Sequence, residues 1–113
     1  MSHPEILNKL DEIEAEMRRI GYWLETPPDL QAAVREGKLR NYLDAPTFES
    51  WLQALFLPNA RAAAKEDTLP SSSQVGLIAM RQYDYHSHVS KAQNLLRLLR
   101  EFDELVINAH KKV

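Results

Sequence analysis

Helical spacing of apolar residues is the feature that most limits how this chain can fold. Near the N-terminus, apolar side chains recur at steps of 4, 3, 4, 3 and 4 residues, which keeps them on one face of an α-helix. No stretch alternates apolar and polar residues as a half-buried β-strand does, so the sequence predicts an all-α protein. The N-terminal series consists of Ile6, Leu10, Ile13, Met17, Ile20 and Leu24.

The first two predicted helices end at residues that interrupt helical hydrogen bonding. We expect the first over residues 2–24, ended by Pro27 and Pro28, because proline has no N–H to donate. A shorter helix over residues 29–36 stops at Gly37. The inward side chains predicted for this shorter helix are Leu30, Ala33 and Val34.

Three further helices follow a predicted loop over residues 38–46, in which Tyr42 and Leu43 are expected to be tucked inward. Thr47 is the predicted N-cap of a helix to residue 65, with a kink at Pro58. The next helix covers 71–83 and opens on a capping box, and the last covers 87–109. All 113 residues are thus predicted to form one domain, a four-helix antiparallel bundle whose second long helix is kinked.

Composition excludes several classes of protein. The chain has no cysteine, which rules out disulfides and zinc–thiolate sites. Sixteen acidic and fourteen basic residues leave a net charge of −2, so a generic electrostatic hold on nucleic acid is not expected. No apolar run approaches the roughly 18 residues of a membrane span or resembles a signal peptide. We therefore predict a cytoplasmic protein with no membrane association.

The sequence offers little for catalysis or metal binding. Asp84, His86 and His88 alternate, and on a helix this spacing spreads the side chains about 200° apart, so that they cannot share one ion. There is no Ser-His-Asp order and no glycine-rich phosphate loop. We predict that the chain is not an enzyme and binds neither a metal nor a cofactor.

Aromatic and basic residues suggest two kinds of contact surface. The apolar face near Pro58 is wider than one helical stripe needs, and an uncovered aromatic patch there would bind a protein or form a homodimer. The alternative is that the loop over 38–46 covers this patch. Trp23 and Trp51 are assigned to the core. A second hypothesis is RNA contact, for which the basic candidates are Arg35, Lys38 and Arg40.

The chain resembles the YqcC-like family of small bacterial proteins. The run from Glu16 to Trp23, followed by Pro27-Pro28, is similar to that family's first helix and linker. Further matching positions are Asp44, Phe48, Trp51-Leu52-Gln53, Phe56-Leu57-Pro58, Arg61 and Leu69-Pro70. The resemblance implies a compact helical bundle. It also implies an association with tRNA pseudouridine synthase C, a label that the family carries without the large α/β catalytic domain of such an enzyme.

From this resemblance we expect an uncharacterised accessory or interaction module, with a tRNA pseudouridine synthase as its candidate partner. The alternative is an RNA-contacting subunit in tRNA pseudouridine modification. The chain departs from the family pattern at three places, namely Arg40 to Tyr42, Asn59 and Gly76-Leu77. The expected partner-binding residues are Asp44, Gln53, Arg61 and Tyr42.

Overall fold

All regular structure in the described part of the chain is helical, which confirms the predicted all-α class. The computed structural model describes residues 3–86 and 90–111. Short 3-10 turns lie at Tyr42–Asp44 and Ser90–Ala92, and a π-helical turn at Leu52–Phe56 joins α3 to α4. The α-helices are α1 (Pro4–Arg19), α2 (Leu30–Arg35), α3 (Phe48–Trp51), α4 (Leu57–Glu66), α5 (Val75–His86) and α6 (Gln93–Lys111).

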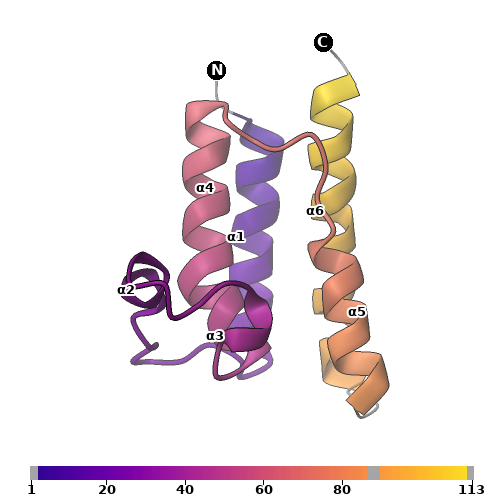
Figure 1. Ribbon diagram of the computed structural model, residues 1–113. Coiled ribbons are helices and arrows are strands. Elements are labelled where there is room, and N and C mark those ends of the chain that lie inside the picture. Colours follow the sequence, from indigo (N-terminus) through magenta and orange to yellow (C-terminus); the bar gives the residue numbers. More distant parts are fainter. Residues whose placement is uncertain (1–2, 87–89, 112–113) are drawn as a thin grey trace.

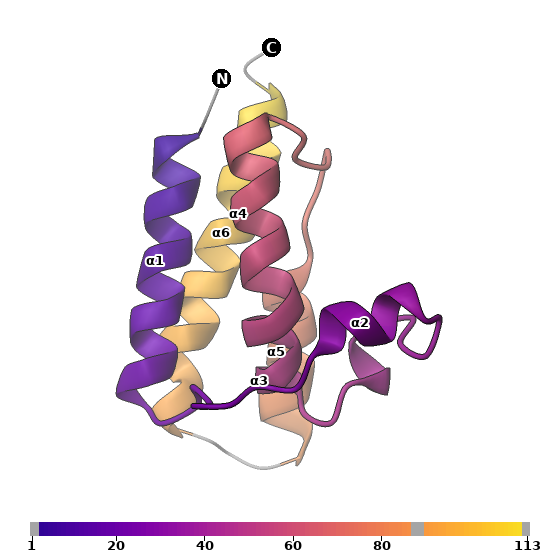
Figure 2. The same ribbon diagram turned by 90° about the vertical axis from the view of Figure 1, so that its left-hand side faces the viewer.

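The long helices contact one another mainly in the order α4, α1, α6, α5. Figure 1 shows α1 running down from the N-terminus, α3 and α4 running up, α5 down and α6 up. Helix α2 lies outside the long helices and packs on the π-helical turn (Figure 2). Helix α5 packs chiefly along α6, and the four-helix antiparallel bundle stays a prediction.

Helix α1 ends at Arg19, earlier than the predicted end at residue 24. Gly21 adopts a left-handed backbone with φ of 82°, and its N–H donates to the carbonyl of Arg18 at 3.3 Å. The N–H of Tyr22 donates to the carbonyl of Met17 at 2.8 Å, which completes a Schellman motif. The glycine therefore stops this helix before the two prolines are reached, and Leu24 is left 42% exposed.

The predicted stop at Gly37 is confirmed. Gly37 has φ of 74°, and the Lys38 N–H donates to the carbonyl of Ala33 at 2.9 Å. Within this short helix Leu30 is buried, but Val34 is 45% exposed, contrary to its predicted inward position.

Thr47 caps α3 as predicted. Its hydroxyl accepts the N–H of Ser50 at 3.0 Å, and the Ser50 hydroxyl accepts the N–H of Thr47 at 3.2 Å. In the preceding loop Tyr42 is half-buried, but Leu43 is 69% exposed and is not tucked in.

A π-helical turn closely precedes Pro58, the residue at which the sequence predicts a kink. The Leu57 N–H donates five residues back, to the carbonyl of Leu52. Proline has no N–H, so the carbonyl of Ala54 loses its helical donor. That carbonyl accepts instead from the Gln31 side-chain amide at 3.1 Å, which ties α2 to this turn.

Helix α5 begins at Val75 rather than at residue 71, and α6 caps it. The Asp103 carboxylate accepts the N–H groups of Val75 at 3.1 Å and Gly76 at 2.8 Å, and the hydroxyl of Ser73 at 2.5 Å. The predicted local capping box is therefore wrong, because a carboxylate 28 residues further along the chain occupies its place. A Cβ built on Gly76 would lie 2.8 Å from the Cα of Arg100, so the two helices cross at a point where only glycine fits.

The core lies between α1, the continuous stretch of α3, the π-helical turn and α4, and the pair α5 and α6. Trp23 and Trp51, both assigned to the core by sequence, are only half-buried and pack against its edge. No helix within the described residues is long and apolar enough to cross a membrane. Among the most completely buried side chains are Leu10, Ile13, Met17, Leu52, Leu57, Leu95, Leu99 and Val106.

Candidate functional site

An apolar groove of about 520 Å³ is the candidate site of this molecule. Four segments line it. The first is the end of α2 with the loop that follows, and the second is the continuous stretch of α3, the π-helical turn and α4. The third is the connector between α4 and α5, and the fourth is the second half of α6. Its apolar lining consists of Val34, Leu39, Tyr42, Trp51, Leu55, Phe56, Ala60, Ala63, Leu69, Pro70, Phe102 and Val106.

Stacked and edge-on aromatic rings form one wall of the groove and continue into the core. Trp51 stacks on Phe56 with ring centroids 5.9 Å apart, and Tyr42 meets Trp51 edge-on at 6.1 Å. Phe56 then packs edge-on against Phe102 of α6 at 5.1 Å. Stacked and edge-on arrangements are the two that aromatic pairs favour, so these contacts stabilise the arrangement of rings in this wall.

The polar side chains of the lining have most of their acceptor atoms occupied. The Asn41 Oδ1 accepts the Leu43 N–H at 2.8 Å, and the Asn59 Oδ1 accepts from Gln31 at 3.2 Å. Arg40 is the one charged residue of the described lining, and no described residue pairs with its guanidinium. The side-chain oxygens of Asn41 and Asn59 are thus already engaged, whereas the N–H groups of the Arg40 guanidinium are not.

Two of the predicted partner-binding residues lie in the loop beside the groove. Tyr42 lines it, whereas the Asp44 carboxylate accepts the Arg40 backbone N–H at 2.9 Å and so holds the loop's own shape. Of the predicted RNA-contacting residues, Arg40 lines the groove, and Arg35 and Lys38 are exposed nearby in the sequence. Lys38 pairs with Glu36 at 3.0 Å.

Gln53 faces away from the groove and is buried. Its amide nitrogen donates to the carbonyl of Leu24 at 2.8 Å, and its carbonyl oxygen accepts the Leu24 N–H at 2.9 Å. Both backbone groups of Leu24 are thereby satisfied, so Gln53 fastens the segment after α1 to the π-helical turn.

Arg61 also makes internal contacts. Its guanidinium contacts Asp11 at 3.1 Å and Glu14 at 2.8 Å, both on α1. It therefore joins α4 to α1, and the four predicted partner-binding residues do not converge on one patch.

The residues of the groove that the sequence did not single out come from α6 and the connector. Phe102 and Val106 belong to the predicted inner face of the last helix, and Leu69 and Pro70 to a matching family motif. Only the packing of α6 against the connector brings them together, so no local pattern could identify them as one site.

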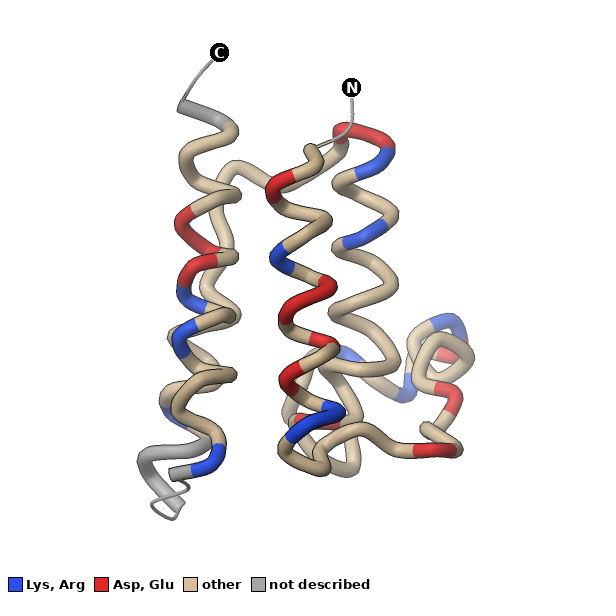
Figure 3. Tube along the Cα trace, turned by 180° about the vertical axis from the view of Figure 1, so that it is seen from behind, with Lys and Arg blue, Asp and Glu red and all other residues tan. Residues whose placement is uncertain are grey.

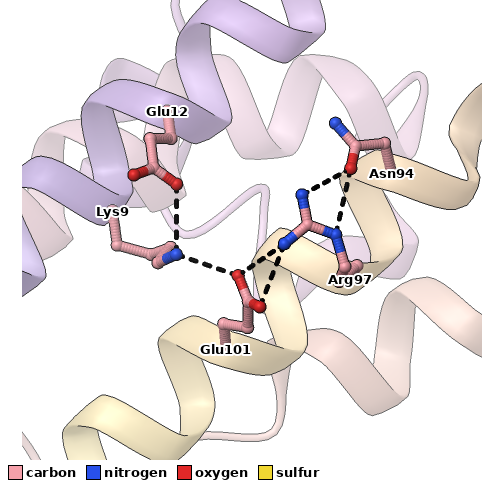
Figure 4. A network of polar contacts seen from close by, with 5 residues as sticks. All are labelled: Lys9, Glu12, Asn94, Arg97 and Glu101. Atoms are coloured by element: carbon pink, nitrogen blue, oxygen red, sulfur yellow. Dashed lines mark hydrogen bonds and ion pairs between the residues drawn. The ribbon is translucent and has the colours of Figure 1, made fainter.

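A cluster of charged side chains links α1 to α6. Lys9 contacts Glu12 at 3.1 Å and Glu101 at 2.9 Å, and Arg97 contacts Glu101 at 3.0 Å (Figure 4). Acidic positions recur along α1, as Figure 3 shows. Figure 4 also shows the Asn94 side-chain oxygen accepting a hydrogen bond from Arg97. Each charged group of the cluster therefore has a partner, and the cluster holds α1 against α6.

Ion pairs shift several carboxyl groups of these helices. The hydrogen bond from Arg19 lowers the pKa of Glu16, and the hydrogen bond from Lys9 lowers the pKa of Glu101. Burial alone would raise the pKa of Glu14, but Arg61 and Arg18 together lower it. Asp103 behaves in the opposite way, because burial raises its pKa more than its hydrogen bonds lower it.

These shifts predict that acid weakens the fold. A carboxylate with a lowered pKa in the folded state stabilises the protein fully above its unfolded pKa of about 4.3, and this contribution disappears as the pH falls from there through the lower folded pKa. Asp103, whose folded pKa is raised, contributes with the opposite sign. The prediction rests on the three carboxylates whose pKa values are lowered by basic partners. We expect the urea concentration at the unfolding midpoint to be lower at about pH 3 than at about pH 7. Glu16→Gln should flatten this dependence more than Glu5→Gln at an exposed position, and equal midpoints at both pH values would contradict the prediction.

No group of three or more His, Cys, Asp or Glu side chains within the described residues is placed to hold a metal ion. The alternating set of Asp84, His86 and His88 lies outside this test, since those side chains are not among the described ones.

A family model described as tRNA pseudouridine synthase C (DUF446) matches residues 5–105, which is nearly the whole chain. This description carries the same label as the family that the motifs between Glu16 and Pro70 resemble, so the resemblance is confirmed. No curated protein and no solved structure matches the chain.

Proposed function

We propose that this chain, which belongs to the DUF446 family described as tRNA pseudouridine synthase C, is a non-enzymatic accessory protein that binds a protein partner. The observation that carries the proposal is the apolar groove of about 520 Å³ with its ordered aromatic wall. Aromatic residues are enriched at protein interfaces, because they bury a large area at a low entropic cost. The family description suggests a tRNA pseudouridine synthase as the partner, and we expect the complex to form in the cytoplasm.

The chemistry of the lining supports binding rather than catalysis. A general acid–base site needs ionisable groups that converge on one point with shifted pKa values. The described carboxyl groups with lowered pKa values are Glu14, Glu16 and Glu101, and each of them contacts a basic side chain away from the groove. Asp103, whose pKa is raised by burial, contacts the groove residue Ser73, but its two oxygens are engaged in capping α5.

The test uses the purified chain and the tRNA pseudouridine synthase of the same organism, mixed after nuclease treatment and analysed by size-exclusion chromatography with light scattering. We expect a complex that survives nuclease. Ala63→Arg, which places a charge and extra volume in the groove, should weaken it at least about tenfold, because an unpaired charge is costly in an apolar interface. Ala62→Arg is the matched control, since Ala62 is exposed and does not line the groove.

Other outcomes would point elsewhere. A mass that doubles without the synthase would indicate a homodimer. If Ala63→Arg and Ala62→Arg bound the synthase equally well, the groove would not be the interface. The specific alternative is an RNA-contacting subunit that uses Arg35, Lys38 and Arg40. Such binding must weaken steeply with added salt, because phosphate contacts release counterions, whereas contact through an apolar groove need not.

A further inference from the structure

The hydrogen bonds already made by the polar side chains around the groove limit which ligands fit it. Asn41 and Asn59 already use their side-chain oxygens as acceptors, and the Ser73 hydroxyl donates to Asp103. Among the described residues, the Arg40 guanidinium has no hydrogen-bond or ion-pair partner. The unpaired Arg40 guanidinium therefore favours a ligand that supplies an acceptor, and a carboxylate accepts charge-assisted, often bidentate, hydrogen bonds from a guanidinium.

The form of the occupant follows from what lines the groove. The described residues contain no β-strand, so an added strand has no sheet edge with which to pair. A segment bound here must satisfy its own backbone hydrogen bonds while it presents apolar side chains to Trp51, Phe56 and Val106. An amphipathic α-helix meets both conditions, because its backbone is internally bonded and its apolar residues recur every three or four positions.

We propose that the groove binds an amphipathic helix of a partner protein, and that an acidic side chain flanking the helix's apolar stripe pairs with Arg40. The inference rests on the proposed function in that the groove is taken as a protein-binding site. It goes further in stating the chemistry of the bound segment. The guanidinium selects among apolar helices by charge, since a basic helix in the same position would place two like charges together.

The experiment is a selection of displayed random 16-residue peptides against the folded wild-type chain, in parallel with the same selection against Arg40→Glu. Wild type is expected to enrich peptides with apolar residues at helical spacing and at least one Asp or Glu beside them. Arg40→Glu is expected to enrich Lys or Arg at that place. A synthetic peptide from the wild-type selection should lose about tenfold in affinity for Arg40→Glu and recover when its acidic residue is replaced by Lys.

Matched controls separate charge at the groove from charge in general. Arg35→Glu makes the same reversal at an exposed residue that does not line the groove, and it should leave the affinity within about twofold. Ala63→Arg should abolish binding of every enriched peptide. Circular dichroism establishes that each variant is folded.

Three results would overturn the inference. The first is that the enriched peptides lack acidic residues or bind Arg40→Glu as well as the wild type. The second is that Ala63→Arg blocks the binding of none of the enriched peptides. The third is binding of dodecanoate, a small apolar carboxylate, where no peptide binds. The selection does not need the synthase. Peptides that obey the rule while the synthase fails to bind would therefore support the inference and refute only the proposed partner.

Discussion

Leu99→Ala is expected to lower the free energy of unfolding by about 2–5 kcal/mol. The Leu99 side chain is fully buried, in the core where α6 packs against α1 and α5. Truncation removes apolar contacts and leaves a cavity that tightly packed neighbours fill only in part. Urea denaturation should show the loss as a lower midpoint, with a melting temperature lower by roughly 8–25 °C.

The control for this prediction is the same truncation at an exposed leucine. Leu43 is 69% exposed in the loop before α3, so Leu43→Ala should change the free energy of unfolding by no more than about 0.5 kcal/mol. Equal losses at the two positions would mean that α6 is not packed in the core as described.

Gly76→Ala is expected to destabilise the fold even though alanine favours helices. In an unconstrained helix the change would gain about 1 kcal/mol. Here the new Cβ would lie 2.7–2.9 Å from the Cγ, Cα and N atoms of Arg100, two of which are backbone atoms that cannot rotate away. The helices α5 and α6 must then separate at their crossing, which we expect to cost about 1–3 kcal/mol overall.

Gly37→Ala is the comparison that isolates the steric cost. A Cβ at Gly37 meets no atom within 4 Å, so that variant carries only the backbone strain of a side chain at a positive φ, about 1 kcal/mol net. Thermal melts of both variants measure the difference. A Gly76→Ala protein as stable as the wild type would contradict the close crossing of α5 and α6.

The faces of the helices could be predicted because that information is local. Side chains three and four residues apart share a helical face whatever the rest of the chain does. The apolar series from Ile6 to Ile20 is accordingly buried as predicted. The caps at Thr47 and Gly37 were also predictable, since each acts on backbone groups within a few residues of itself.

The candidate site was predictable only in outline. The loop over 38–46 and the helix around Pro58 do border the groove, as their aromatic and basic residues suggested. The polar residues expected there, Gln53 and Arg61, instead hold Leu24 and α1 in place. A sequence shows that a polar residue is present, but its hydrogen-bond partner depends on which segments become neighbours in space.

Spacing and caps along the chain thus determined the helical class and which side of α1 faces inward, but not the inward side of the short α2, where Val34 is exposed. Tertiary structure alone decided that Asp103 caps α5, that Gln31 satisfies the carbonyl freed by Pro58, and that Phe102 meets Phe56 at the groove. The physical reason is one of range. Helical periodicity acts over three or four residues, whereas each of these contacts joins groups separated by more than twenty residues, which only the packed arrangement of the helices brings together.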